Sequence, residues 1–405
     1  MRMGLIILVL SGFSGCNDTS DPGQTEPDVM AQRPDGSTLA DDAHLDSRVT
    51  VPDLGLITVV DSRAPNKDAR IDAMQVPDTG LSKSPDAAMD PPDASPPITQ
   101  ACLNAGFRNP PAFGPNYDQF GPTIGSHCQG TNHQVIENIE RVVFIGDSVT
   151  VGTPPQVSAD FYRTKLAHRL AERFQIEPPD AFWQEVNLID GVSLTQRSGA
   201  FASCAKYGAR TDDLLQDNTL LSDCFEAADF DQRTLVIMTI GGNDISSLTQ
   251  DGIDGVAPAE LWAQTEGFVS LLRGAIAWLR APGRFPNGIS IVYANMFEFT
   301  DGTGDVTACP AAGLAGFGAQ WEDPDLLAEL VVWANEQYLS VAVDYAVDMI
   351  FMLEHFCGHG FNAQNPNAPC YRGPDSETWF DLTCIHPNST GHAEIARLFM
   401  SVVEE

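Results

Sequence analysis

The chain has 405 residues, and its 55 Asp and Glu outnumber its 22 Lys and Arg, which gives a formal net charge of −33. Charge repulsion at this level excludes nucleic acids and anionic lipid surfaces as partners and favours a neutral or cationic ligand. The length allows more than one domain. The composition, however, changes near residue 100 and divides the chain into a leader, a spacer and one folded domain.

Residues 1–16 have the composition of an export signal. One Arg precedes an apolar stretch at residues 4–10, which is too short to span a bilayer as a helix. The stretch ends at Phe13-Ser14-Gly15-Cys16, and small residues directly before a Cys resemble the cleavage box of bacterial lipoproteins. This resemblance implies that Cys16 becomes a lipid-bearing N-terminus in the cell envelope. An ordinary secretory signal is the alternative.

Residues 17–100 are rich in Asp, Pro, Ser and Ala. So few apolar residues cannot bury enough surface to offset the conformational entropy that folding would cost. We therefore predict a disordered, acidic tether for this segment. The folded domain should span residues 101–405.

Short apolar runs alternate with segments of helical periodicity along residues 101–405. These patterns predict strands at 141–145, 185–189, 235–240, 288–295 and 349–353. They predict helices at 160–174, 211–215, 258–279, 325–345 and 391–403. Strands that alternate with helices indicate a parallel sheet covered on both faces, so the expected fold class is α/β.

Three short motifs carry the residue types of nucleophilic acyl transfer. They are Gly146-Asp147-Ser148, Gly241-Gly242-Asn243-Asp244 and His386-Pro387-Asn388. The first two follow predicted buried strands, and ligands of open α/β sheets bind just beyond the carboxyl ends of such strands. Ser148 and Asn243 should therefore reach one crevice, where a late His can serve as the base.

Each of these motifs also has a simple structural explanation as a turn. A side-chain amide such as that of Asn243 can nevertheless donate to a tetrahedral oxyanion. The backbone N–H of Gly208, just before a predicted helix start, can serve as a second donor. The chain has no G-x-S-x-G, so the usual nucleophile elbow of lipases is not supported.

Eight Cys remain beyond Cys16, and an even count in an exported domain indicates disulfides. Short loops favour the pairs Cys102–Cys128, Cys204–Cys224 and Cys370–Cys384. His355, Cys357 and His359 alternate and could bind zinc, but a disulfide is the preferred state of Cys357. We expect no metal and no other cofactor.

Together the Ser148, Gly208, Asn243 and His386 blocks resemble the SGNH (GDSL-type) hydrolase family over most of residues 141–403. The resemblance implies a flavodoxin-like three-layer α/β/α sandwich and ester hydrolysis. It also implies that Ser148 is the nucleophile and His386 the base. The donors to the oxyanion would be the Ser148 N–H, Gly208 and Asn243.

The family usually places an Asp three residues before the His, where this chain has Thr383. The imidazole still needs a hydrogen-bond partner for its second ring nitrogen. Asp381 and the Thr383 backbone carbonyl are the two candidates, and the carbonyl is preferred. We therefore expect Asp381→Asn and Thr383→Ala to have mild effects.

The sequence thus predicts a secreted or envelope-anchored serine hydrolase that cleaves carboxylic esters through an acyl-enzyme on Ser148. A polysaccharide acyl (acetyl) esterase, a phospholipase and an inactive surface-binding module are the alternatives. The expected partner is a small-molecule, lipid or glycan ester. The chain should be a monomer that reaches a membrane only through the Cys16 lipid.

Overall fold

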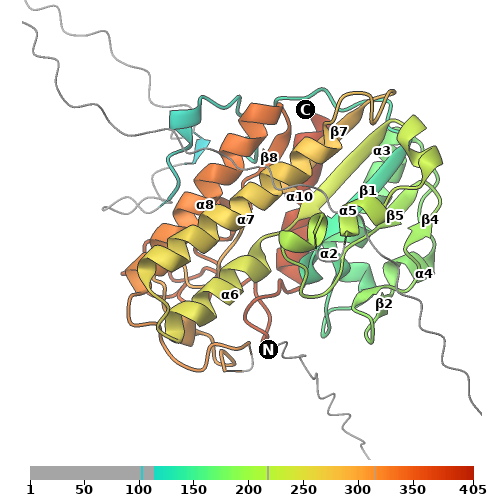
Figure 1. Ribbon diagram of the computed structural model, residues 1–405. Coiled ribbons are helices and arrows are strands. Elements are labelled where there is room, and N and C mark those ends of the chain that lie inside the picture. The colour runs from blue at the N-terminus through green and yellow to red at the C-terminus, as the bar shows by residue number, and fades with distance from the viewer. Residues whose placement is uncertain (1–101, 104–113, 217–218, 314) are drawn as a thin grey trace, which may run out of the picture. The chain divides into compact units, whose positions relative to one another are not determined.

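The computed structural model describes residues 102–103, 114–216, 219–313 and 315–405 (Figure 1). The predicted signal at 1–16 and the whole predicted tether at 17–100 lie outside the described residues, so these two assignments stay predictions. Within the described residues, no helix is both long and apolar enough to cross a membrane.

A six-stranded sheet forms the centre of the domain, in the order β4-β5-β1-β6-β7-β8. All neighbouring strands pair in parallel except β4, which pairs antiparallel with β5 at one edge. Every residue of β1 and β6 is buried, which explains their continuous apolar sequences. The strands are β1 (Arg141–Gly146), β4 (Arg197–Ser198), β5 (Phe201–Ser203), β6 (Thr234–Thr239), β7 (Ile289–Ala294) and β8 (Asp348–Ile350).

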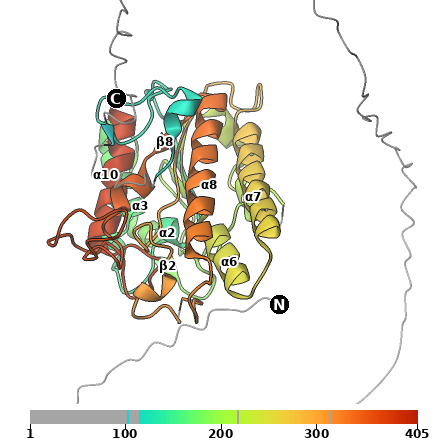
Figure 2. The same ribbon diagram turned by 90° about the vertical axis from the view of Figure 1, so that its left-hand side faces the viewer.

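Helices cover both faces of this sheet (Figure 2). α7 (Pro258–Leu279) packs beside α8 (Pro324–Tyr345) on one face, and α3 (Tyr162–Phe174) packs beside α10 (Ser389–Glu404) on the other. Successive residues of a strand point to opposite faces. Accordingly, alternate residues of β1 join two separate apolar cores. The predicted α/β fold, with a mostly parallel sheet between two helical layers, is confirmed.

Shorter elements connect these layers. α6 (Gly242–Ile253) follows β6 directly and packs against α7. A small hairpin of β2 (Val186–Asn187) and β3 (Val192–Ser193) stands apart from the main sheet. The remaining short helices are η2 (Tyr117–Phe120), α2 (Ser148–Val151), η3 (Ser158–Asp160), α4 (Ala181–Gln184), η4 (Asp212–Leu214), α5 (Leu220–Asp223), η5 (Ala227–Asp231), η6 (Val306–Ala308) and α9 (Met352–Phe356).

Three predicted elements differ from the structure. The strand at 185–189 is only the two-residue β2, and β5 occupies the place beside β1. The helix at 211–215 is a single 3-10 turn, η4. The strand at 349–353 ends at Ile350, and α9 begins two residues later. All three are short segments, in which apolar spacing alone cannot separate strand from helix.

Four disulfides pair the eight Cys of the domain. The predicted pairs Cys102–Cys128 and Cys204–Cys224 are confirmed. The predicted Cys370–Cys384 pair is wrong. Cys370 forms a disulfide with Cys357, and Cys384 forms one with Cys309, 75 residues away. Cys357 forms a disulfide, as was preferred, so the alternative zinc site loses its thiolate. The described residues hold no group of three or more His, Cys, Asp and Glu side chains suited to a metal. Four disulfides are typical of an exported protein.

Candidate active site

Ser148 lies at the first position of α2, directly after β1. Gly146 makes this junction possible, because its φ is 151° and an added Cβ would lie 2.2 Å from the Thr239 carbonyl oxygen. The Asp147 side chain caps α2 by accepting from the Val149 N–H at 3.0 Å. The first N–H groups of a helix have no acceptor within it, so the Ser148 N–H is available to an anion.

A buried Arg holds the other end of α2. The Arg163 guanidinium donates to the carbonyls of Thr150 and Val151, at the C-terminus of α2, and to those of Trp183 and Gln184 in α4. Carbonyls at a helix C-terminus lack partners within the helix and favour a cation. Arg163 thus ties the helix that carries Ser148 to α3 and α4.

His386 comes to Ser148 from a loop just before α10. Its Nε2 lies 2.8 Å from Ser148 Oγ, although 238 residues separate the two. The loop folds back on itself, since the Asp381 N–H donates to the His386 carbonyl at 2.9 Å. The Cys309–Cys384 disulfide fixes the same loop to the segment around η6. Sequence reasoning placed Ser148 and His386 together, and the structure brings their side chains into hydrogen-bond contact.

The second ring nitrogen of His386 contacts a group that the sequence analysis did not consider. His386 Nδ1 lies 2.7 Å from Thr383 Oγ1, and Thr383 Oγ1 lies 2.5 Å from Asp381 Oδ1. The preference for the Thr383 backbone carbonyl was therefore wrong. The reason is the turn, which aims the hydroxyl of Thr383 at the ring. The expected effect of Thr383→Ala stays a prediction.

Asn243 and Gly208, the other predicted donors, lie in adjacent segments. The Asn243 side-chain amide donates to the Ala209 carbonyl at 2.9 Å, which orients the amide and leaves its second N–H for a ligand. Gly208 precedes Ala209 and has a φ of 72°, a conformation that favours glycine. Asn243 lines the pocket beside Ser148 and His386, whereas Gly208 does not.

Two buried carboxyl groups support these segments. Asp244 accepts from the N–H and the hydroxyl of Thr211, and burial raises the pKa of Asp244 to about 6. Burial likewise raises the pKa of Asp147, the cap of α2, to about 7. Both groups hold backbone turns next to the site, which explains why each of the two glycine-containing motifs includes an acidic residue.

Burial lowers the pKa of His386 to about 4. The imidazole is therefore neutral above this pH, and only the neutral ring can accept a proton from Ser148. We expect kcat/KM to fall on acidification with a midpoint near pH 4 rather than near the ordinary His value of about 6.5. Released acid should be quantified by chromatography across this range. Circular dichroism at each pH separates loss of the base from unfolding, and a midpoint near 6.5 with the fold intact would contradict the expectation.

A mostly apolar pocket opens beside Ser148 and His386. It is formed by α6, the segment after β7, α8 and the loop before α10 that carries His386. Its apolar walls are Ile245, Phe297, Phe299, Val306, Phe317 and Val331. The sequence analysis did not find this pocket. The Phe-x-Phe at 297–299, shortly after β7, is the sequence signal that could have indicated it.

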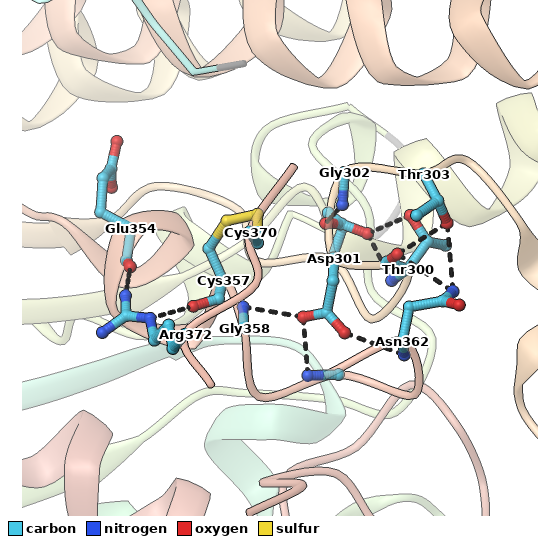
Figure 3. Close-up of a disulfide and its surroundings, with 12 residues drawn as sticks. Thr300, Asp301, Gly302, Thr303, Glu354, Cys357, Gly358, Asn362, Cys370 and Arg372 are labelled. Atoms are coloured by element: carbon cyan, nitrogen blue, oxygen red, sulfur yellow. Dashed lines mark hydrogen bonds between the residues drawn. A yellow bond between two sulfur atoms is a disulfide. The ribbon is translucent and has the colours of Figure 1, made fainter. Parts of the chain in front are cut away.

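Asp301 joins one wall of this pocket to the disulfide loop at 357–370 (Figure 3). Its Oδ1 accepts from the N–H groups of Gly358 and Gly360 at 2.8 Å, and its Oδ2 accepts from the Asn362 N–H at 2.9 Å. Burial, followed by the nearby Glu298 carboxyl, raises the pKa of Asp301 to about 7. Asp301 therefore fastens the segment after β7 to the loop that leads towards His386.

Asp301→Asn should lower the free energy of unfolding by about 1–3 kcal/mol. An amide has a single acceptor oxygen, so at least one of the three N–H donors would face the amide nitrogen and lose its partner. Urea denaturation measures the change. Asp375→Asn, at an exposed position five residues beyond this loop, is the control and should change stability little. Equal effects of the two substitutions would show that the Asp301 hydrogen bonds contribute nothing measurable.

The mostly parallel sheet between two helical layers, with Ser148 and His386 in contact, indicates a hydrolase of α/β class. Residues 144–394, more than half of the chain, match the GDSL-like lipase/acylhydrolase family, and the chain belongs to this family. The matched region includes Ser148, Gly208, Asn243 and His386.

Solved structures give weaker similarities. A gut microbial diltiazem-metabolizing enzyme is 14% identical, with a TM-score of 0.42, and the match covers 67% of this chain and 49% of that one. A two-domain esterase active on acetylated mannans is 15% identical, with a TM-score of 0.32, and the match covers 65% and 48%. The chain thus spans about half the length of each structure. No curated protein matches it.

Proposed function

We propose that this hydrolase cleaves carboxylic esters through an acyl-enzyme on Ser148. The observation that carries the proposal is the 2.8 Å contact between Ser148 Oγ and Nε2 of the neutral, buried His386, two residues that line a mostly apolar pocket. A serine hydroxyl becomes an effective nucleophile when such a base removes its proton during attack.

The reaction would proceed in two steps. Ser148 Oγ attacks the ester carbonyl while its proton moves to His386 Nε2, and the alcohol leaves with that proton. Water then attacks the acyl-enzyme, with His386 again as the base, and the acid leaves. The oxyanion formed in each step would be stabilised by the Ser148 N–H, the Gly208 N–H and the free N–H of the Asn243 amide.

The walls of the pocket support an ester with an apolar acyl group. Phe297, Phe299 and Phe317 line the same pocket as Ser148, and the described residues that line it include no Lys or Arg that could recognise a charged acyl chain. Burying apolar acyl carbons against such walls stabilises the complex by about 0.8 kcal/mol per CH₂ group. We propose an acyl chain longer than acetyl as the substrate class.

A fluorophosphonate probe and a panel of p-nitrophenyl esters from acetate to palmitate test the proposal. Labelling of the wild-type protein at Ser148, with kcat/KM rising beyond acetate, is the expected result. Preference for acetate would favour a polysaccharide acetyl esterase instead. Absence of both labelling and hydrolysis would favour an inactive surface-binding module.

We further propose that the protein is an exported, monomeric lipoprotein attached to the envelope through Cys16. The lipoprotein-like Ser14-Gly15-Cys16 and the four disulfides support export. Mass spectrometry of the membrane fraction should find a chain that starts at Cys16 and carries a diacylglycerol. A soluble chain cleaved elsewhere is the result that would rule out the anchor.

A further inference from the structure

Asp381, Thr383, His386 and Ser148 are joined in one line of short hydrogen bonds. Asp381 Oδ1 lies 2.5 Å from Thr383 Oγ1, Thr383 Oγ1 lies 2.7 Å from His386 Nδ1, and His386 Nε2 lies 2.8 Å from Ser148 Oγ. The carboxyl group thus stands one side chain further from the imidazole than a directly bonded carboxylate would.

The number of protons available determines which group donates in each of these hydrogen bonds. An ionised carboxylate only accepts, and a hydroxyl has a single proton to donate. Asp381 Oδ1 also accepts from the Thr383 N–H at 2.8 Å, so it is the acceptor of both Thr383 groups. The Thr383 hydroxyl therefore donates to Asp381 and accepts from His386 Nδ1–H. The ring proton then lies on Nδ1, and the Nε2 lone pair faces the Ser148 hydroxyl.

We propose that Thr383 is a positioning residue for His386 and that Asp381 acts on His386 only through the Thr383 hydroxyl. This inference rests on the proposed function of Ser148 and His386. When Nε2 takes the Ser148 proton, Nδ1 keeps its own, and the ring becomes an imidazolium. The polarised Thr383 oxygen then stabilises the positive charge, and no proton passes to Asp381.

The surroundings of Asp381 fit this role. The Gln156 amide donates to Asp381 Oδ2 at 3.0 Å, so the second oxygen is also held. The Asp381 N–H donates to the His386 carbonyl, which closes the turn around Thr383. Among the described residues, no cation forms an ion pair with Asp381. The Thr383 hydroxyl and its N–H are the main partners of the carboxylate.

The chain contains a second Asp-x-Thr turn that serves as an internal control. Asp305 Oδ1 accepts from the Thr307 N–H at 3.0 Å and from its hydroxyl at 2.7 Å, the same two bonds as at Asp381 and Thr383. Thr307 is exposed, and its hydroxyl bonds to Asp305 rather than to a histidine ring. Thr307→Val therefore removes the same local hydrogen bond without changing the environment of His386.

Kinetics of three variants test the positioning role. Thr383→Val should lower kcat about a hundredfold with little change in KM, because His386 loses the group that fixes its tautomer. Thr383→Ser keeps the hydroxyl and should stay within about threefold of the wild type. Thr307→Val should leave kcat unchanged. Comparable kcat values for Thr383→Val and Thr383→Ser would overturn the proposal.

A double-mutant cycle tests whether Asp381 acts through Thr383. Asp381→Asn should lower kcat about tenfold or more in the wild-type protein and have little further effect in Thr383→Val. Additive losses would show that Asp381 reaches the site by another route, and would overturn this part of the proposal.

The tautomer of His386 can be read without turnover. In ¹⁵N-histidine-labelled protein, the His386 signal, assigned by its loss in His386→Ala, should show a protonated Nδ1 and an unprotonated Nε2. Thr383→Val should shift the ring towards the other tautomer, and Thr383→Ser should restore it. An Nε2–H ring in the wild-type protein would refute the relay even if esters are hydrolysed. A correct tautomer without labelling or hydrolysis would instead refute the proposed function.

Discussion

Ser148→Ala and His386→Ala should each lower kcat for ester hydrolysis by about a thousandfold or more. The first change removes the attacking oxygen, and the second removes the base that takes its proton. Since the two groups act as one unit, the double variant should be no slower than the slower single variant. Initial rates on the best p-nitrophenyl ester, at saturating concentration, measure the three losses.

The fold should survive these changes. Ser148 and His386 share one hydrogen bond, and its loss costs about 1 kcal/mol of stability. Ser401→Ala, which removes a similar hydroxyl bond on α10, is the control and should retain full activity. A Ser148→Ala protein that still reacts with a fluorophosphonate, or that keeps a tenth of the activity, would show that another residue is the nucleophile.

Removing the Cys309–Cys384 disulfide should lower the free energy of unfolding by about 4 kcal/mol, because it closes a loop of 75 residues. It should also lower kcat of the folded enzyme. Cys384 has a φ of 72° and lies two residues before His386, so the bond holds the turn that presents the imidazole. The double variant Cys309→Ala, Cys384→Ala, measured by urea denaturation and by kcat below the unfolding transition, tests both effects.

The Cys102–Cys128 disulfide provides the matched control. The Ser126 N–H donates to Glu405, at the C-terminal end of α10, whereas His386 lies just before the N-terminal end of that helix. Sixteen helical residues separate the two ends by about 24 Å. Removing this bond should cost about 3–4 kcal/mol of stability and leave kcat unchanged. Equal kcat in both double variants would mean that the Cys309–Cys384 bond only stabilises the domain.

Long, strongly patterned elements were predicted well from the sequence. The helix at 258–279 has the same bounds as α7, and β1 and β6 lie within one residue of the expected strands. β5 has only three residues and lies in the sheet through its pairing with β1, so no local pattern could indicate it. α6 begins within the glycine-containing motif of Asn243, where a turn was the natural expectation.

The candidate site was predictable to the extent that its residues follow strands or carry unusual chemistry. Ser148 and Asn243 were found because a parallel sheet brings the ends of its strands to one edge. His386 was found from its own motif late in the chain and from the family resemblance. The choice of the Thr383 hydroxyl over its carbonyl depends on the turn geometry between Asp381 and His386, which spacing alone does not determine. The apolar pocket is lined by segments that are spread along the chain from α2 to the loop of His386. Its shape therefore depends on the tertiary fold and could not be predicted from local sequence.

The Asp301 contacts have a consequence for how this enzyme can change its specificity. The three N–H donors come from residues 358–362, while the acceptor lies in the segment that forms the pocket wall. Replacing only one of these two segments would leave either the Asp301 carboxylate or the three N–H groups without hydrogen-bond partners. Changes of substrate range should therefore require the joint exchange of both segments. In directed recombination with a related protein, no crossover should be placed between residues 298 and 362.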